Sequence, residues 1–97
     1  MKVKISAVNF KADEDLKAYV TEKVEKLSFY YEKIIESEVI LKESKSDDQQ
    51  DKIVKIKLVV PGNDLFVKKQ CKTYQEAIDL AVDALKKQIT KHKEKKM

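Results

Sequence analysis

Four short segments of the chain have the apolar pattern of β-strands. Apolar residues recur at every second position over residues 2–8, 52–60 and, apart from Lys69, 65–71, and a period of two is typical of strands that bury one side. Residues 38–43 hold the apolar run Val39-Ile40-Leu41 and predict a further strand. Lys69 falls on the inward side of the last strand, so we expect it near the edge of the sheet, where its ammonium group reaches water.

Two longer segments have apolar residues at the helical spacing of three or four. The first helix is expected from Asp13, its N-cap, to about residue 32. The second is expected to begin at Thr73-Tyr74-Gln75-Glu76, which fits a T-x-x-E capping box. The apolar stripes of the two helices are Leu16, Val20, Val24, Leu27 and Tyr31, and Tyr74, Ile78, Ala81, Val82, Leu85 and Ile89.

The order of these elements restricts the topology. A polar hairpin loop at residues 44–51 and a Pro-Gly-Asn-Asp turn at residues 61–64 make the last three strands antiparallel neighbours. A right-handed crossover through the first helix places the first strand parallel to a neighbour. Each helix has one apolar stripe, so both must cover the same face of the sheet. We therefore predict one α+β domain over residues 1–97, in the order β-α-β-β-β-α, with a four-stranded mixed sheet.

The charge of the chain is unevenly distributed. Its 97 residues carry a net charge of +4, from 21 basic residues, all of them lysine, and 17 acids. Residues 86–97, the basic helix end and tail, hold six lysines and one acid, whereas the preceding 85 residues sum to −1. One or two lysines are enough to compensate a helix dipole, so six of them favour an anionic partner such as nucleic acid. Charge alone leaves a solvated, dipole-compensating helix end as an equal alternative.

Catalytic and metal chemistry find little support in the sequence. Cys71 is the only cysteine and is expected to be a small buried hydrophobe, and its isolation fits a reducing, cytoplasmic compartment. His92 has no second His or Cys beside it to complete a metal site. Asp79 and Asp83 are expected to pair with lysines. We expect no enzyme activity, cofactor, metal, signal peptide or membrane span.

Helix geometry groups the lysines. Two border the apolar face of the first helix, and four lie on the flank or the outer side of the second. If the helices are neighbours, these sets merge into one basic surface. Tyr19 and Tyr30 lie near the first set, where stacking on bases and packing at the core edge are both open. The candidate RNA-binding residues are Lys23, Lys26, Lys86, Lys87, Lys91 and Lys93.

Three stretches carry a family resemblance through their order and spacing. They are residues 16–27, residues 60–65 (Val-Pro-Gly-Asn-Asp-Leu) and residues 77–95, which include Lys-Gln-Ile-Thr-Lys-His-Lys at 87–93. On these residues, and over nearly its whole length, the chain resembles the short hibernation-promoting factor and ribosome-associated inhibitor family. Its members are also described as ribosomal subunit interface or sigma-54 modulation proteins.

The resemblance implies a fold similar to double-stranded-RNA-binding domains and a binding place on the small ribosomal subunit. Such proteins occupy the channel where mRNA and tRNA would sit, and so inhibit translation in slow growth or stress. The basic helix positions of the family correspond to Lys23, Lys26, Lys87, Lys91 and Lys93. Relatives often have arginine at position 87, a change that keeps phosphate neutralisation. The sixth lysine of the set, at position 86, aligns with an acidic position in some relatives.

The resemblance also bears on assembly. Long members carry a second, dimerising domain, so a chain of this length is expected to be a short, monomeric member. Short factors in some bacteria act beside a separate ribosome-dimerising factor, which is a candidate partner here. Two other functions stay open from the sequence. One is a general double-stranded-RNA-binding module, and the other is a protein-interaction domain that docks its basic helix end on an acidic partner.

Overall fold

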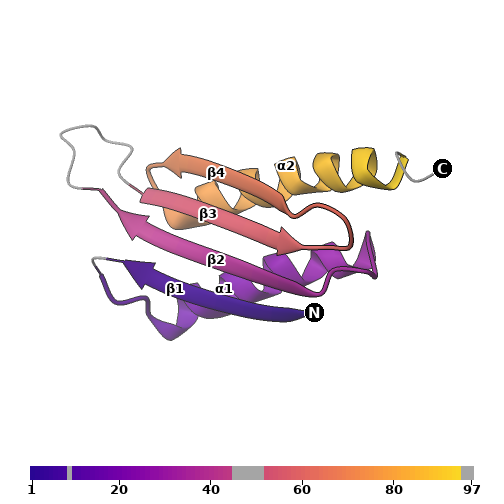
Figure 1. Ribbon diagram of the computed structural model, residues 1–97. Coiled ribbons are helices and arrows are strands. Elements are labelled where there is room, and N and C mark those ends of the chain that lie inside the picture. Colours follow the sequence, from indigo (N-terminus) through magenta and orange to yellow (C-terminus); the bar gives the residue numbers. More distant parts are fainter. Residues whose placement is uncertain (9, 45–51, 95–97) are drawn as a thin grey trace.

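The computed structural model describes residues 1–8, 10–44 and 52–94, with side chains described as far as residue 92. The elements, in chain order, are β1 (Lys2–Val8), α1 (Glu14–Glu25), the 3₁₀ helix η1 (Lys26–Phe29), β2 (Glu36–Glu43), β3 (Lys52–Val59), β4 (Leu65–Cys71) and α2 (Tyr74–Glu94). This is the predicted β-α-β-β-β-α order (Figure 1).

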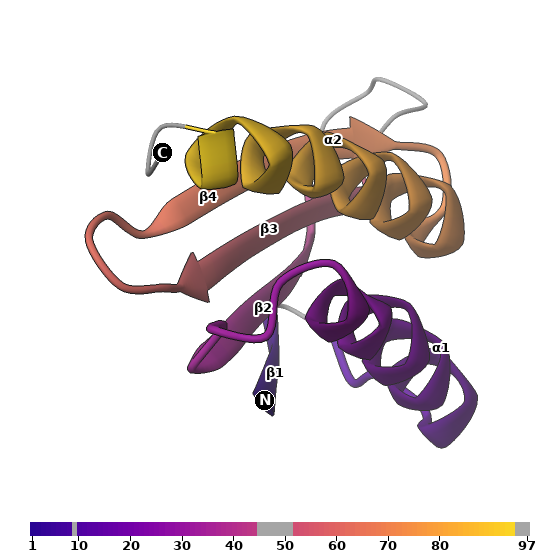
Figure 2. The same cartoon turned by 90° about the vertical axis from the view of Figure 1, so that its right-hand side faces the viewer.

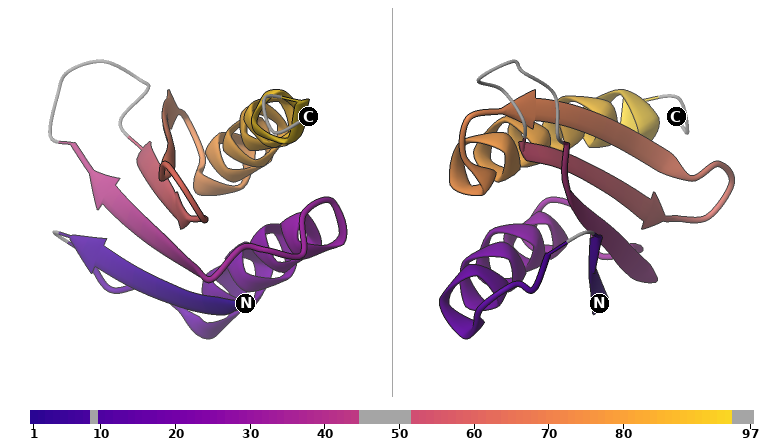
Figure 3. Two further views of the ribbon diagram at one scale, coloured as in Figure 1. Left: turned by 45° about the vertical axis from the view of Figure 1, so that its right-hand side comes forward. Right: turned by 90° about the vertical axis from the view of Figure 1, so that its left-hand side faces the viewer.

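The four strands form one mixed sheet in the order β1-β2-β3-β4. β1 runs parallel to β2, and the β2–β3 and β3–β4 pairs are antiparallel, as predicted. Both helices lie on one face of the curved sheet, with α2 over β3 and β4 and α1 on the side of β1 (Figure 2, Figure 3). They also contact each other. No helix of the described residues lies on the opposite face of the sheet.

The core lies between the sheet and the two helices. Every residue of the two predicted apolar stripes is buried, and so are Val54, Ile56 and Leu58 of β3. Leu27 and Leu85, one from each helical segment, are both 0% exposed. Burial of such a side chain contributes about 1.5–3 kcal/mol. The apolar period alone therefore identified the buried side of each helix.

The helix starts follow the predicted caps. The Asp13 side chain accepts a hydrogen bond from the Leu16 N–H at 2.7 Å. Thr73 Oγ1 accepts from the Glu76 N–H at 3.1 Å, which is the threonine half of the predicted capping box. These bonds satisfy backbone donors that have no carbonyl partner within a helix.

The predicted end of the first helix is wrong. The α-helix stops at Glu25 and the chain continues as η1. The change is local: the Tyr30 N–H donates at 3.0 Å to the Leu27 carbonyl, three residues earlier, which is the spacing of a 3₁₀ turn. In addition, the Ser28 hydroxyl bonds to the Glu25 carbonyl at 2.7 Å, in the way that serine competes with helical bonding.

The connections and strand ends differ little from expectation. β2 begins at Glu36, two residues earlier than predicted, because Glu36 pairs with Lys2 on one side and Val59 on the other. The turn at 61–64 holds Gly62 at a φ of 97°, a conformation that glycine adopts readily. Lys69 is half-buried on the edge strand β4, as expected. The predicted loop at 44–51 lies, apart from Ser44, outside the described residues.

Candidate nucleic-acid interface

The contact between α1 and α2 leaves a solvent-facing groove. Its volume is about 310 Å³, and it is lined by Lys23, Lys26, Asp79, Leu80, Val82, Asp83 and Lys86. Three of the six candidate lysines thus come together from two helical segments. We call Lys23, Lys26 and Lys86 the groove lysines. The two aspartates of the lining make the groove less positive than its lysines alone would.

Asp79 links the two helices across this groove. Its Oδ1 atom accepts a hydrogen bond from the Tyr19 hydroxyl at 2.7 Å and lies 3.9 Å from Lys23 Nζ. The hydrogen bond to Asp79, with a contribution from burial, raises the pKa of Tyr19. Lys23 Nζ also lies 5.4 Å from the Tyr19 ring centroid. Of the two roles open for Tyr19, packing between the helices is therefore the one that the geometry favours.

Lys26 stands at the junction of α1 and η1 and has a weaker partner. Its Nζ atom lies 3.9 Å from Glu22 Oε1, and the two side chains are 52% and 70% exposed. An exposed pair of this kind contributes between zero and about 1 kcal/mol. A phosphate group can therefore replace Glu22 as the partner of Lys26 at little cost.

Lys86 has an aromatic partner, and it makes no ion pair with an acid in the part of the chain that the structure describes. Its Nζ atom lies 4.9 Å from the centroid of the Tyr30 ring, within the range of a cation–π interaction. Tyr30 is 49% exposed. The ring therefore holds the Lys86 ammonium near the groove without neutralising its charge.

The remaining candidate lysines lie outside the groove. Lys87 and Lys91 are exposed and four residues apart on α2, so they are neighbours on one side of the helix. Lys93 lies within α2, but its side chain is outside the described part of the structure. The six predicted residues thus form two groups among the described side chains, the groove lysines and an exposed α2 pair.

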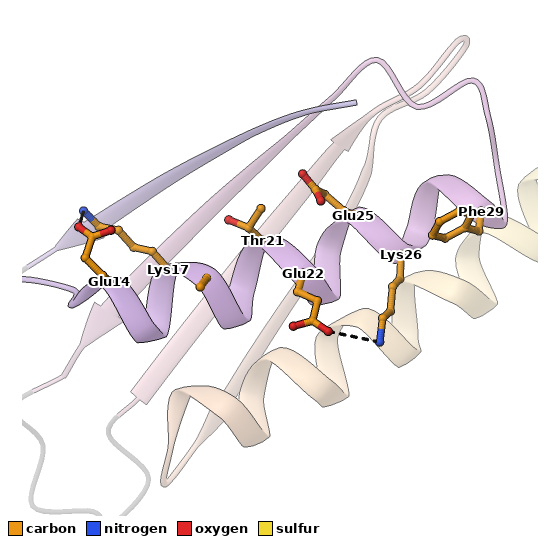
Figure 4. A pocket seen from close by; sticks show the side chains of 8 residues that line it. Glu14, Lys17, Thr21, Glu22, Glu25, Lys26 and Phe29 are labelled. Atoms are coloured by element: carbon orange, nitrogen blue, oxygen red, sulfur yellow. Dashed lines mark ion pairs between the residues drawn. The ribbon is translucent and has the colours of Figure 1, made fainter.

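A second depression limits the interface on the α1 side. It measures about 590 Å³ and is lined by Glu14, Lys17, Ala18, Thr21, Glu22, Glu25, Lys26 and Phe29 (Figure 4). Three glutamates face two lysines there, so this surface does not favour an anion.

At the end of this depression, Phe29 is 86% exposed. Sequence reasoning overlooked Phe29, although its position two residues after buried Leu27 places it off the apolar stripe. An exposed aromatic beside a lysine is suited to stacking on a base.

His92 has a packing role that the sequence analysis also missed. Its ring meets the Tyr31 ring edge-on, with centroids 5.6 Å apart. A Cβ atom on Gly62 would lie 3.8 Å from His92 Cε1, so the β3–β4 turn meets the end of α2 here. The signal was present: His92 follows Ile89 by three residues and continues the buried stripe. The contact fixes the direction of the basic helix end.

The residues considered for catalysis or metal binding are dispersed. Within residues 1–8, 10–44 and 52–94, no three His, Cys, Asp or Glu side chains come together in a way that suits a metal ion. Cys71 is buried as predicted, and burial raises the pKa of its thiol, which lowers its reactivity. Across the same ranges, no helix has the length and apolar character needed to cross a membrane.

Comparison with known proteins identifies the family. The family model described as Sigma 54 modulation protein / S30EA ribosomal protein matches residues 3–97. The protein belongs to this family. The ribosome hibernation promoting factor of Escherichia coli strain K12 is 33% identical over 95 residues, which cover 98% of this chain and 96% of that protein. The protein of the same name from Pseudomonas putida KT2440 is 32% identical over 95 residues, covering 98% and 89%.

Two solved structures share the fold of this chain. The N-terminal domain of Protein Y from Thermus thermophilus has a TM-score of 0.81 at 24% identity, covering 95% of this chain and 99% of that one. A ribosomal subunit interface protein from Coxiella burnetii has a TM-score of 0.83 at 17% identity, covering 96% and 98%. The predicted α+β fold and the family resemblance are both confirmed.

Proposed function

We propose that this family member is a ribosome hibernation factor. It binds the small ribosomal subunit in the channel for mRNA and tRNA, and it inhibits translation in slow growth or stress by occupying that channel. The observation that supports this most is the arrangement of the groove lysines. They reach one groove from two helices, in a chain whose relatives are named ribosome hibernation promoting factors.

The groove lysines bind rRNA phosphates from both sides of the groove. Lysine acts as a compact point charge, suited to phosphate oxygens and not to the forked recognition of bases. Each neutralised phosphate releases counterions, and that release drives binding. Recognition of this kind reads the shape of folded RNA and not its sequence. Because Tyr19 also holds Asp79, the helices keep their spacing when Lys23 turns from Asp79 to a phosphate.

The exposed α2 pair extends the contact along the helix. Lys87 and Lys91 bind a further stretch of rRNA backbone, and Lys93 is the third proposed contact on this side. The packing of His92 against Tyr31 and the β3–β4 turn fixes the direction of this end of α2. The protein acts in the cytoplasm as a monomer without cofactor or metal, and a separate ribosome-dimerising factor is a candidate partner.

Co-sedimentation with vacant small subunits tests this function. Wild-type protein is expected to bind vacant subunits and to fail when mRNA and tRNA already fill the channel. The Lys87→Glu, Lys91→Glu, Lys93→Glu triple variant is expected to lose binding and to stop inhibiting a cell-free translation extract. A triple variant that still inhibits translation would contradict the proposed contacts.

The same assay separates the two other functions. Equal affinity for the small subunit and for any free RNA duplex would indicate a general double-stranded-RNA-binding module. Binding that survives ribonuclease treatment would indicate a protein-interaction domain with an acidic partner. The proposed function requires ribonuclease-sensitive binding together with preference for the vacant subunit.

A further inference from the structure

The face of the sheet opposite the helices has two halves of different charge. Figure 1 views the molecule from this face. In one half the lysines have acidic partners: Lys4 Nζ lies 3.2 Å from Glu36, and Lys57 Nζ lies 3.5 Å from Asp64. In the other half Lys42, Lys55 and Lys68 point outward from β2, β3 and β4. We call these three the sheet lysines.

The sheet lysines are close neighbours. Lys55 and Lys68 are direct partners across the β3–β4 pair. Lys42 pairs with Ile53, the outward residue next to Lys55 on β3. Neighbouring strands are only about 4.8 Å apart, and like charges directly opposite each other are destabilising. This arrangement therefore carries a cost in the free protein.

No acid among the described residues is a direct cross-strand partner of a sheet lysine, and the outward acid Glu38 of β2 lies opposite Lys57, one pair beyond the Ile40–Lys55 pair. The outward residues of this half of the face are otherwise Ser6, Val8, Ile40, Ile53 and Gln70. None of the sheet lysines makes an ion pair with any residue in the described ranges. Lysines that protect an edge strand from aggregation are common, and this explains Lys68 on β4. It does not explain Lys42 and Lys55, whose strands are paired on both sides.

We infer that the sheet lysines form a second RNA-binding surface, on the opposite side of the sheet from the groove lysines. Three adjacent point charges without an ion pair among the described residues suit consecutive phosphates of a nucleic acid backbone. Phe66 is 54% exposed and is the next outward residue to Lys68 on β4, where its ring can stack on a base.

The inference rests on the proposed function and extends it. The helices and the sheet lysines lie on opposite faces of one sheet, so a domain lodged in an RNA channel presents both faces to its walls. RNA held by α1 and α2 on one side and by the sheet lysines on the other would clamp the domain between two rRNA segments. Two separated contact faces make binding steeply dependent on salt.

Salt-dependent affinity for vacant small subunits is the first test. The Lys42→Gln, Lys55→Gln, Lys68→Gln variant removes three charges and leaves a polar, uncharged side chain at each position. It is expected to bind about 10- to 100-fold more weakly near physiological salt, with a slope of log K against log salt that is smaller by about 2 to 3. The matched control removes the same charge from three exposed loop positions, Lys11→Gln, Lys33→Gln and Lys72→Gln, and is expected to keep the wild-type slope.

A photocrosslinker identifies the occupant of this face. Benzoylphenylalanine in place of Phe66 is expected to crosslink to rRNA in the small-subunit complex. Crosslinks to ribosomal protein alone, or none at all, would overturn the inference. A sheet variant that binds like its loop control would do so too.

The helix variants keep this inference and the proposed function apart. If Lys87→Glu, Lys91→Glu abolishes binding while the sheet variant behaves as wild type, the second surface is refuted and the proposed function stands. If the helix variant binds as wild type, the proposed function fails, and the second surface fails with it.

Discussion

The lysines of the two helical segments are the same residue type with different electrostatic surroundings. Lys23 and Lys26 of the first segment face Asp79 and Glu22. On α2, Lys86 lies against a tyrosine ring, and Lys87 and Lys91 are exposed. The number of lysines on a helix is therefore a poor measure of the charge available to a phosphate. The partner of each lysine determines how much of that charge remains free.

The largest expected effect concerns the hydrophobic core, to which both helical segments contribute. Leu27→Ala and Leu85→Ala each remove a fully buried side chain and are expected to lower the free energy of unfolding by about 2–5 kcal/mol. Urea denaturation measures this. Leu80→Ala, on α2 but 47% exposed, is the control and is expected to change stability by no more than about 0.5 kcal/mol. Equal small losses at all three sites would contradict the assignment of the core.

Reversing the charges of the exposed α2 pair should show the difference between the two helical segments most clearly. Lys87→Glu, Lys91→Glu is expected to weaken small-subunit binding by about 100-fold, since two phosphate contacts become repulsive. The fold should be preserved, because exposed substitutions cost little. The control, Lys11→Glu, Lys17→Glu, changes the net charge equally, and Lys17 lies in the glutamate-lined depression of α1. A control that weakens binding as much as the α2 variant would show that only total charge matters.

Removal of the acid that faces Lys23 should reduce the difference between the segments. Asp79→Asn frees Lys23 and is expected to strengthen binding about two- to fivefold, with a steeper salt dependence. Titration of the tyrosine absorbance or NMR signal is expected to show a lower pKa for Tyr19, because Asp79 is the main cause of its raised value. Unchanged affinity would mean that Asp79 does not limit Lys23.

The same contact predicts a dependence of stability on pH. The folded-state pKa of Tyr19 is raised, so the stabilisation from its bond to Asp79 is fully present below the ordinary tyrosine pKa of about 10. It is lost as the pH rises through the higher folded value. Wild type is therefore expected to lose more stability than Asp79→Asn when the pH is raised above about 10. Denaturation curves that stay parallel for the two proteins over that range would argue against the link.

The smallest expected effect concerns the aromatic partner of Lys86. Tyr30→Leu removes the ring that positions the ammonium group, and a cation–π contact at an exposed site contributes about 0.5–1 kcal/mol. Binding to the small subunit is expected to weaken about two- to fivefold. Tyr30→Phe keeps the ring and serves as the control. A Phe variant as weak as the Leu variant would assign the effect to the hydroxyl group.

The buried side of every element was predictable because it depends on a period. Alternation in β3 and the three- and four-residue spacing in α2 each leave one side apolar, and burial of that side dominates folding. The end of α1 was not predictable in this way. Leu27 and Tyr31 keep the apolar spacing whether the chain is α-helical or 3₁₀, so the period does not reveal which carbonyl accepts the next hydrogen bond.

The sequence predicted which residues belong to the candidate site better than it predicted how they are arranged in space. The sequence placed Lys23 and Lys86 beside the apolar stripes of their helices, to share one surface if the helices are neighbours, and the structure brings them into one groove. The sequence could not predict that Asp79, which is 60 residues from Tyr19 along the chain, would accept a hydrogen bond from the Tyr19 hydroxyl at 2.7 Å. The sequence suggested for His92 only the role of a metal ligand without partners, because the turn at Gly62 that it contacts is remote in sequence.

The sequence by itself determined the family, the order of elements, the apolar stripes and the excess of lysine at the end of α2, because each is local or periodic. Only the tertiary structure decided which lysines face acids, which face a ring and which face solvent. It also showed that Lys42, Lys55 and Lys68 lie together on the open face of the sheet. Charge interactions act through space over a few ångströms, so strand register and helix packing decide which charges meet.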